Sequence, residues 1–223
     1  MCKNGFSRAF ENSALDGHND FRVNRVGESI YNIGATCNEC PDKDACTSLK
    51  GLCSSSRTTT VQTTTTVSNV PSTTTTLNTR CPMTAMKTAF QNSAIDGHNN
   101  FRSLVARGLA ENGKYVGINA PVAANMSLMN YDCTAEYFAL KHVKSCDKQH
   151  WADCNSPDYK ENIHILETNE TSLNNSFVIQ TAISTWASEL KNNGIRLNMV
   201  FTPEVSRQKN KVTSVTKVWS VIV

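Results

Sequence analysis

One short stretch of sequence occurs twice in the chain, and this repeat limits the possible folds more than any other feature. Residues 9–22 read AFENSALDGHNDFR, and residues 89–102 read AFQNSAIDGHNNFR. A match this dense indicates two copies of one domain type in tandem. The copies are unequal, because the first has room for only roughly 50 residues, few for an independent core. The second copy extends to residue 223 and is long enough for one.

The two copies are separated by a low-complexity segment over residues 54–80 with threonine runs at 58–60, 63–66 and 73–76. Such a segment buries too little apolar surface to offset its ordering entropy. Ser/Thr-rich tracts with proline are typical of O-glycosylated linkers, and an unmodified disordered spacer is the alternative. We therefore expect a fragmentary first copy over residues 1–53, a disordered linker over 54–80 and a second domain over 81–223.

Cysteine usage indicates an oxidising compartment. The chain has nine cysteines, and their odd number leaves at least one unpaired within the chain. Cys37-x-x-Cys40 with Cys46 and Cys53 would suit a zinc knuckle, but beside such a linker disulfides are favoured, with their pairing left open. Asn-x-Ser/Thr sequons also favour the secretory route; they begin at Asn125, Asn169 and Asn174.

Charge and hydropathy exclude two other classes. The net charge of +3 comes without a basic block, which speaks against a nucleic-acid-binding protein. No apolar run approaches the ~18 residues of a transmembrane helix. No secretory leader is visible after Met1, so we expect the leader to lie outside this chain or the gene model to begin late.

Hydrophobic periodicity predicts an α+β fold for the second copy. Apolar residues at helical spacing predict helices over residues 84–108, 132–147 and 175–192, and Asn193-Gly194 predicts the end of the last. Alternation predicts strands over residues 161–166 and 211–223. Helices and strands in this order indicate a layered sandwich.

Five motifs in this order resemble the CAP superfamily (SCP/TAPS), and in particular the activation-associated secreted proteins and venom allergen-like proteins of nematodes. The motifs are GHNNFRSLVARG (97–108), AANMSLMNYDC (123–133), CDKQH (146–150), ENIHI (161–165) and WASELK (186–191). The resemblance implies an α-β-α sandwich. In the ENIHI motif Lys160 stands where the family usually has glycine.

The resemblance also implies that the chain is a truncated double-domain form. Residues 2–22 resemble a domain start, and residues 27–53 resemble the closing strand and Cys-rich hinge. The second copy stops just after a Val-Trp resembling the family's signature strand, so we expect it to lack its last strands. An unpaired sheet edge near Val212 and Val218 is then expected to favour aggregation. A gene-prediction artefact that folds poorly is a further reading of such a chain.

The family's cleft carries two His and two Glu, which match His150, Glu161 and Glu189 here. Thr213 stands where the second His is expected. Zinc takes imidazole nitrogen and carboxylate oxygen ligands, so one His and two Glu would bind it weakly at most. His164 is a poor substitute, because its odd offset from Glu161 puts it on the opposite face of a strand. A polar cleft with solvated carboxylates is the alternative.

The remaining histidines favour structural roles. His142 lies on the inner face of a predicted helix, and His18 and His98 recur within the repeated His-Asn-x-x-Arg element. The chain lacks a Gly-x-Ser-x-Gly elbow for nucleophilic catalysis. His150 and Glu161 could act as a general base pair on geometry alone.

We therefore expect a secreted, non-enzymatic protein without a cofactor that acts outside the cell by binding a protein or receptor of a host. The alternatives are a metal-dependent hydrolase that uses the cleft, and a sterol or lipid carrier.

Overall fold

The computed structural model describes residues 7–11, 26–42, 46, 51–54, 81, 86–146, 148–149, 161–170, 172–206 and 212–219. The predicted linker over 54–80 therefore lies outside the described residues from residue 55 onward, and so do His18 and His150. The elements are β1 (Ser7–Glu11), α1 (Thr88–Ala106), α2 (Cys133–Ser145), β2 (Ile163–Glu167), α3 (Asn175–Asn193), α4 (Pro203–Ser206) and α5 (Thr213–Trp219).

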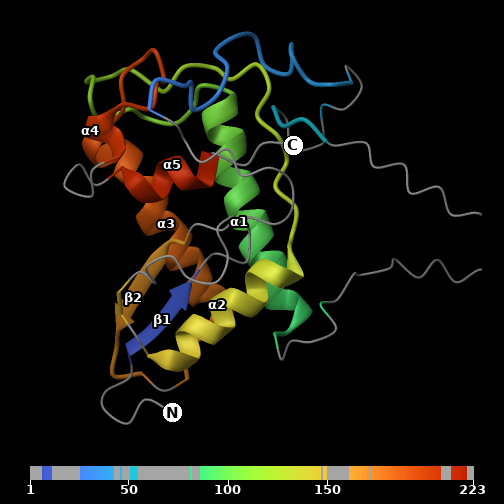
Figure 1. Ribbon diagram of the computed structural model, residues 1–223, viewed down its shortest axis with the longest axis vertical. Helices are drawn as coiled ribbons and strands as arrows, with labels where there is room; N and C mark the ends of the chain where they lie inside the picture. Colours follow the sequence, from blue (N-terminus) through green and yellow to red (C-terminus); the bar gives the residue numbers. More distant parts are fainter. Residues whose placement is uncertain are drawn as a thin grey trace, which may run out of the picture.

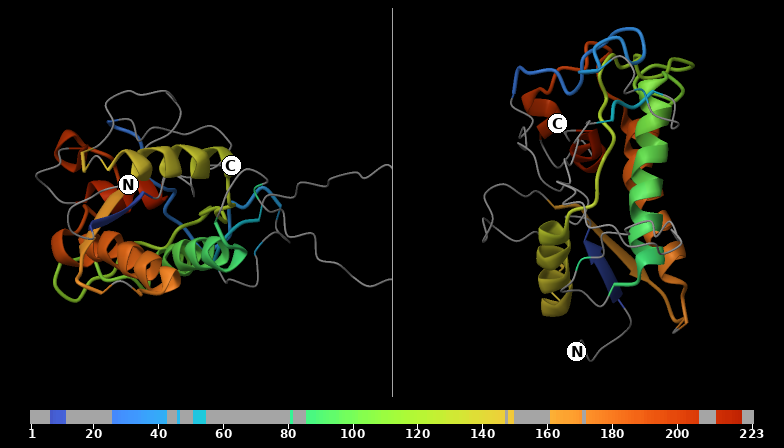
Figure 2. Two further views of the ribbon diagram at one scale, coloured as in Figure 1. Left: turned by 90° about the horizontal axis from the view of Figure 1, so that it is seen from below. Right: turned by 90° about the vertical axis from the view of Figure 1, so that its right-hand side faces the viewer.

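The elements form three layers, with a two-stranded sheet in the middle (Figure 1). Strand β1 pairs antiparallel with β2, in a register that sets Ser7 opposite Glu167 and Glu11 opposite Ile163. Helix α2 covers one side of the sheet, and α1 and α3 lie together on the other side (Figure 2). The predicted α-β-α sandwich of the α+β class is confirmed.

The ends of α2 and α3 follow from local sequence. Asp132 accepts hydrogen bonds from the amides of Thr134 and Ala135, which caps the start of α2. Asn174 caps α3 in the same way through the amide of Ser176. Gly194, with φ of 65°, ends α3, as the Asn-Gly pair predicted.

Helices α1 and α3 pack closely because a glycine sits where they cross. A Cβ on Gly97 would lie 2.7 Å from Cδ1 of Ile183, so a larger residue would force side chains of α3 to move. Phe90, Ala94, Ile179 and Trp186 join one hydrophobic cluster at this contact. The glycine of the Asp-Gly-His motif therefore has a packing role.

A second hydrophobic cluster joins the N-terminal segment to the rest of the chain. Ile30, Tyr31 and Leu52 are buried together with residues of α1, α3 and α5. In Figure 1 the segment runs across the end of α1, beside the loop that follows that helix. The short N-terminal segment thus shares its core with the second copy.

The predicted strand over residues 211–223 is wrong where the structure describes it, because residues 213–219 form α5. Val212, Val215 and Val218 are buried in the larger cluster, so this segment presents no exposed sheet edge. The reason is tertiary: the carboxylate of Glu189 on α3 binds the first amides of α5. This cap outweighs the strand preference of β-branched residues.

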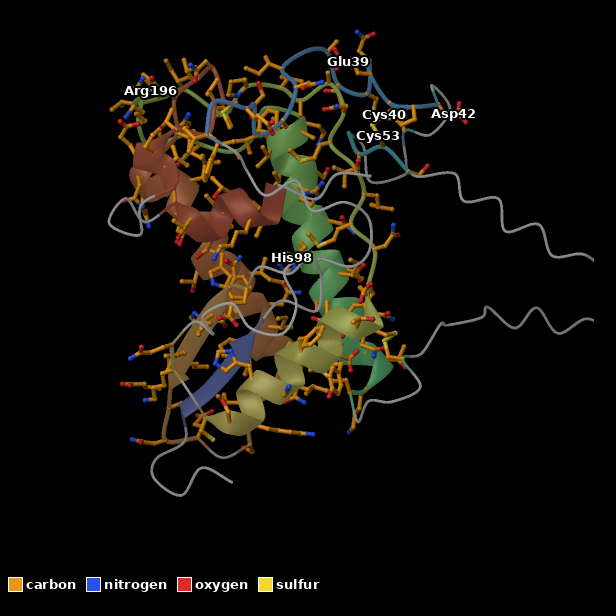
Figure 3. All side chains as sticks on the ribbon, viewed as in Figure 1. Glu39, Cys40, Asp42, Cys53, His98 and Arg196 are labelled. Atoms are coloured by element: carbon orange, nitrogen blue, oxygen red, sulfur yellow. A yellow bond between two sulfur atoms is a disulfide. The ribbon has the colours of Figure 1, made fainter. Side chains whose placement is uncertain are left out.

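Disulfides hold both parts of the chain. Cys37 pairs with Cys46 and Cys40 with Cys53, so the predicted disulfides are confirmed and the zinc knuckle is wrong. Figure 3 labels Cys40 and Cys53. Cys81 pairs with Cys133, and Cys146 is also disulfide-bonded. Among the described helices, none is long and apolar enough to span a bilayer.

Candidate functional site

Glu189 lies near the end of α3 and faces the start of α5. Its Oε2 accepts hydrogen bonds from the amides of Ser214 at 2.8 Å and Val215 at 2.9 Å. Burial raises the pKa of the Glu189 carboxyl above its usual value, while these amides and Lys217 act in the opposite direction. The carboxylate therefore serves as the helix cap of α5, and the solvated alternative does not describe it.

Glu161 precedes β2 and binds α2. Its Oε2 lies 2.9 Å from Nδ1 of His142, which is almost completely buried. The backbone carbonyl of Glu161 accepts a hydrogen bond from Nζ of Lys217 at 2.7 Å. The structural role predicted for His142 is confirmed, and its partner is one of the predicted metal ligands.

The structure brings two of the three predicted ligands against the same short helix. Glu189 binds the N-terminus of α5, and Glu161 binds Lys217 within it. Thr213, the residue at the position of the second His, is the first residue of α5. The third predicted ligand, His150, lies outside the described residues.

In this arrangement Glu161 and Glu189 both make hydrogen bonds to the protein through Oε2. The ammonium of Lys217 donates to the backbone carbonyl of Glu161 and interacts electrostatically with Glu189. Within the described residues, no group of three or more His, Cys, Asp and Glu side chains is arranged to hold a metal ion. Weak zinc binding with His150 stays a prediction.

His164 on β2 packs against α3. Its ring packs edge-on against Trp186 at 6.4 Å between ring centroids, and burial lowers its pKa. The imidazole is therefore held against the core, and the expectation that it does not replace the missing ligand stays a prediction.

The repeated His-Asn-x-x-Arg element has a structural role in the second copy, as predicted. His98, labelled in Figure 3, is buried in α1 with Nδ1 2.9 Å from the carbonyl of Ala94. Burial lowers the pKa of His98 to about 4. Asn99 binds both the amide and the carbonyl of Met129, which fixes the segment entering α2 along the side of α1.

Arg102 completes this arrangement. Its guanidinium is fully buried and donates to the carbonyl of Ser127 through Nε and Nη2, at 3.0 and 2.6 Å. Its Nη1 donates to the carbonyl of Val218 at 2.5 Å. The fork of the guanidinium therefore joins α1, the segment before α2 and α5.

Sequence reasoning missed a buried carboxylate on α2. Glu136 is fully buried and accepts hydrogen bonds from Nε2 of Gln91 at 2.9 Å and Oη of Tyr131 at 2.7 Å. Burial, followed by the bond to Glu136, raises the pKa of the Tyr131 hydroxyl. The sequence contained a signal for this burial. Glu136 lies three residues before Ala139 and seven before Val143, which places it on the apolar side of the helix.

The loop after α1 presents apolar side chains to solvent. Leu109, Val116 and Ile118 are exposed, and Val116 is fully so. The loop is held by its own backbone: the amide of Asn112 donates to the carbonyl of Ile118, and that of Ala120 to the carbonyl of Ala110. We call residues 108–119 the apolar loop.

Comparison with known proteins gives a family and a relative. Residues 95–205 match the family described as CAP, the cysteine-rich secretory protein family. The "Ancylostoma secreted protein" of Ancylostoma caninum is 36% identical over 126 residues, which cover 56% of this chain. The match spans 29% of the relative's own length. No solved structure matches the chain significantly.

Proposed function

Because residues 95–205 belong to the cysteine-rich secretory protein (CAP) family, we propose that the chain is a secreted protein that acts outside the cell by binding, without catalysis. Its partner in this proposal is an extracellular protein or receptor of a host. The relative from Ancylostoma caninum is named a secreted protein.

The disulfides support the extracellular location. Three pairs are described, and they tie down both the N-terminal segment and the start of α2. Disulfides persist in oxidising compartments and are rare in the cytosol.

The observation that carries the proposal is the hydrogen bonding of the two described carboxylates. Glu189 is committed to the cap of α5, and Glu161 to His142 of α2. Groups held in this way stabilise the fold, and within the described residues no three side chains that bind metals converge beside them. The arrangement therefore supports a binding role over hydrolysis.

The apolar loop is the surface that we assign to binding. Contiguous exposed apolar surface marks many protein–protein contacts. Leu109, Val116 and Ile118 are exposed apolar side chains on a loop whose backbone is already fixed.

Secretion and binding can be tested together. The full chain, produced behind an added leader in insect cells, is expected in the medium with its disulfides formed. After fluorescent labelling, it should bind mammalian cells saturably, and trypsin treatment of the cells should abolish the binding. Val116→Asp should weaken binding at least tenfold. Tyr137→Asp, which changes an exposed aromatic on α2, should not.

Two outcomes would favour the alternatives. Calorimetric titration of zinc should show no micromolar binding, whereas micromolar binding that Glu161→Ala abolishes would support the metal-dependent hydrolase. Binding to protein-free vesicles with and without cholesterol, in place of trypsin-sensitive binding to cells, would support the sterol or lipid carrier.

A further inference from the structure

We propose that the described residues between 26 and 54 (26–42, 46 and 51–54) form a docking module that binds the domain of its own chain and completes that domain's core. We call these residues the N-terminal module. The proposal is independent of the partner that the protein binds, because it rests on contacts within the chain.

The first contact is a short antiparallel pairing with the segment after α3. The amide of Gly27 donates to the carbonyl of Phe201, and the amide of Phe201 donates back to Glu28, both at 2.8 Å. The amide of Ile30 donates to the carbonyl of Met199 at 2.7 Å. This exchange in both directions is the pattern of strand addition at a backbone edge.

The second contact runs along the segment between α1 and α2. The amide of Ala124 donates to the carbonyl of Asn32 at 2.8 Å, and the amide of Gly34 donates to that of Val122 at 3.0 Å.

The end of the module continues this contact. Cys53 donates to Met126 and accepts from Leu128, at 2.8 and 2.7 Å. The module therefore satisfies backbone groups of residues 122–128 that lie in the core of the domain.

Side chains fill the space between these two backbone contacts. Ile30 and Leu52 are 2% and 0% exposed and pack with Val105, Ala123 and Met199. Oη of Tyr31 donates to the carbonyl of Pro121 at 2.7 Å, and burial raises the pKa of this hydroxyl. The cluster is therefore complete only when residues that precede 55 pack with residues that follow 80.

The module is cross-linked within itself. The Cys37–Cys46 and Cys40–Cys53 disulfides both join residues of the module to one another. Such loops limit the unbound conformations, so less entropy is lost on docking. Because residues 55–80 join the module to the domain in one chain, the domain is exposed to a high local concentration of the module. For short linkers this concentration is about millimolar. This favours docking on the same chain over docking on a second copy.

The test is cleavage of the folded full chain between module and domain. A protease site is inserted in the threonine run at 63–66, in a Cys2→Ser background that prevents a disulfide from Cys2 across the cut. After cleavage, size exclusion with light scattering should show both pieces in one particle with the mass of one chain. Denaturation without reductant should then release them. Pieces that separate without denaturant, or a particle of two chains, would overturn the proposal.

A matched pair of variants tests whether the two pieces are held together by the buried face of the module. Ile30→Asp introduces a charge at a buried position, and Ile33→Asp introduces the same charge at a position that is 48% exposed. Dilution of the cleaved protein should show at least a tenfold weaker association for Ile30→Asp and less than a twofold change for Ile33→Asp. Equal effects of the two variants would refute the assigned surface.

Hydrogen exchange keeps the proposal testable if Ile30→Asp fails to fold. In the cleavable chain that keeps Ile30, the amides of Ala124 and Leu128 should be protected before cleavage and stay protected after it. Rapid exchange of both amides in the intact chain would refute the docking.

Discussion

Replacing Arg102 by lysine tests whether the His-Asn-x-x-Arg element holds the domain together. The guanidinium is 0% exposed and makes three hydrogen bonds to two carbonyls, those of Ser127 and Val218. A lysine keeps the positive charge and the aliphatic stem, but its single ammonium reaches only one of the two carbonyls. The other carbonyl then stays buried without this donor.

The expected magnitude follows from the bonds lost. Hydrogen bonds from charged groups contribute about 1.5–3 kcal/mol each, and Arg102→Lys loses two of the three. The free energy of unfolding should fall by about 3–6 kcal/mol, out of a usual total of about 5–15 kcal/mol. At a urea dependence of about 2 kcal/mol/M, the unfolding midpoint should fall by roughly 2 M.

The assay is urea unfolding followed by circular dichroism, with Arg107→Lys as the matched control. Arg107 follows α1, is half-buried, and its Nε donates only to Ser103 of that helix at 3.2 Å. The control should change the free energy of unfolding by less than about 1 kcal/mol, as surface substitutions usually do. If Arg102→Lys changed stability no more than Arg107→Lys, the structural role that we give to Arg102 would be refuted.

Three further changes test other contacts. Burial lowers the pKa of His98 from 6.5 to about 4. The free energy of unfolding should therefore be at its full value above pH 6.5 and fall by about 3 kcal/mol as the pH is lowered to 4. In unfolding curves, His98→Gln should abolish this fall. Burial raises the pKa of Glu189 above 4.5, so its contribution to stability is full below pH 4.5 and is lost as the pH rises through the folded value. Glu189→Gln should therefore gain stability relative to wild type as the pH rises above 4.5, and a difference that stays constant with pH would contradict this. Removing the Cys81–Cys133 disulfide by a double change to alanine should lower stability by about 4 kcal/mol, because the bridge closes a long loop; an unchanged thermal midpoint would contradict this.

Much of the fold could be predicted because its signals are local. The periodicities that predicted helices over 84–108, 132–147 and 175–192 correspond to α1, α2 and α3. Asp132 and Asn174 satisfy the first amides of their helices from within the neighbouring sequence. Such caps and periodicities act over one or two turns, so they can be read without the rest of the chain.

The candidate site could be predicted only in part. The sequence pointed to Glu161 and Glu189 together with His150, and the structure places both glutamates against α5. It did not indicate that Glu189 caps that helix, that Glu161 binds His142, or that Glu136 is buried with Tyr131. Each of these bonds joins residues whose contact depends on how helices and strands pack.

By itself, the sequence determined the family, the order of the main helices and the use of disulfides. Only the tertiary structure decided the form of residues 213–219, where valine and threonine favour a strand but the carboxylate of Glu189 caps a helix. It also decided where the N-terminal segment belongs, since Ile30 and Leu52 complete a core with Val105 and Met199. The physical reason is that burial and capping depend on the distance between atoms in space, which spacing along the chain does not specify.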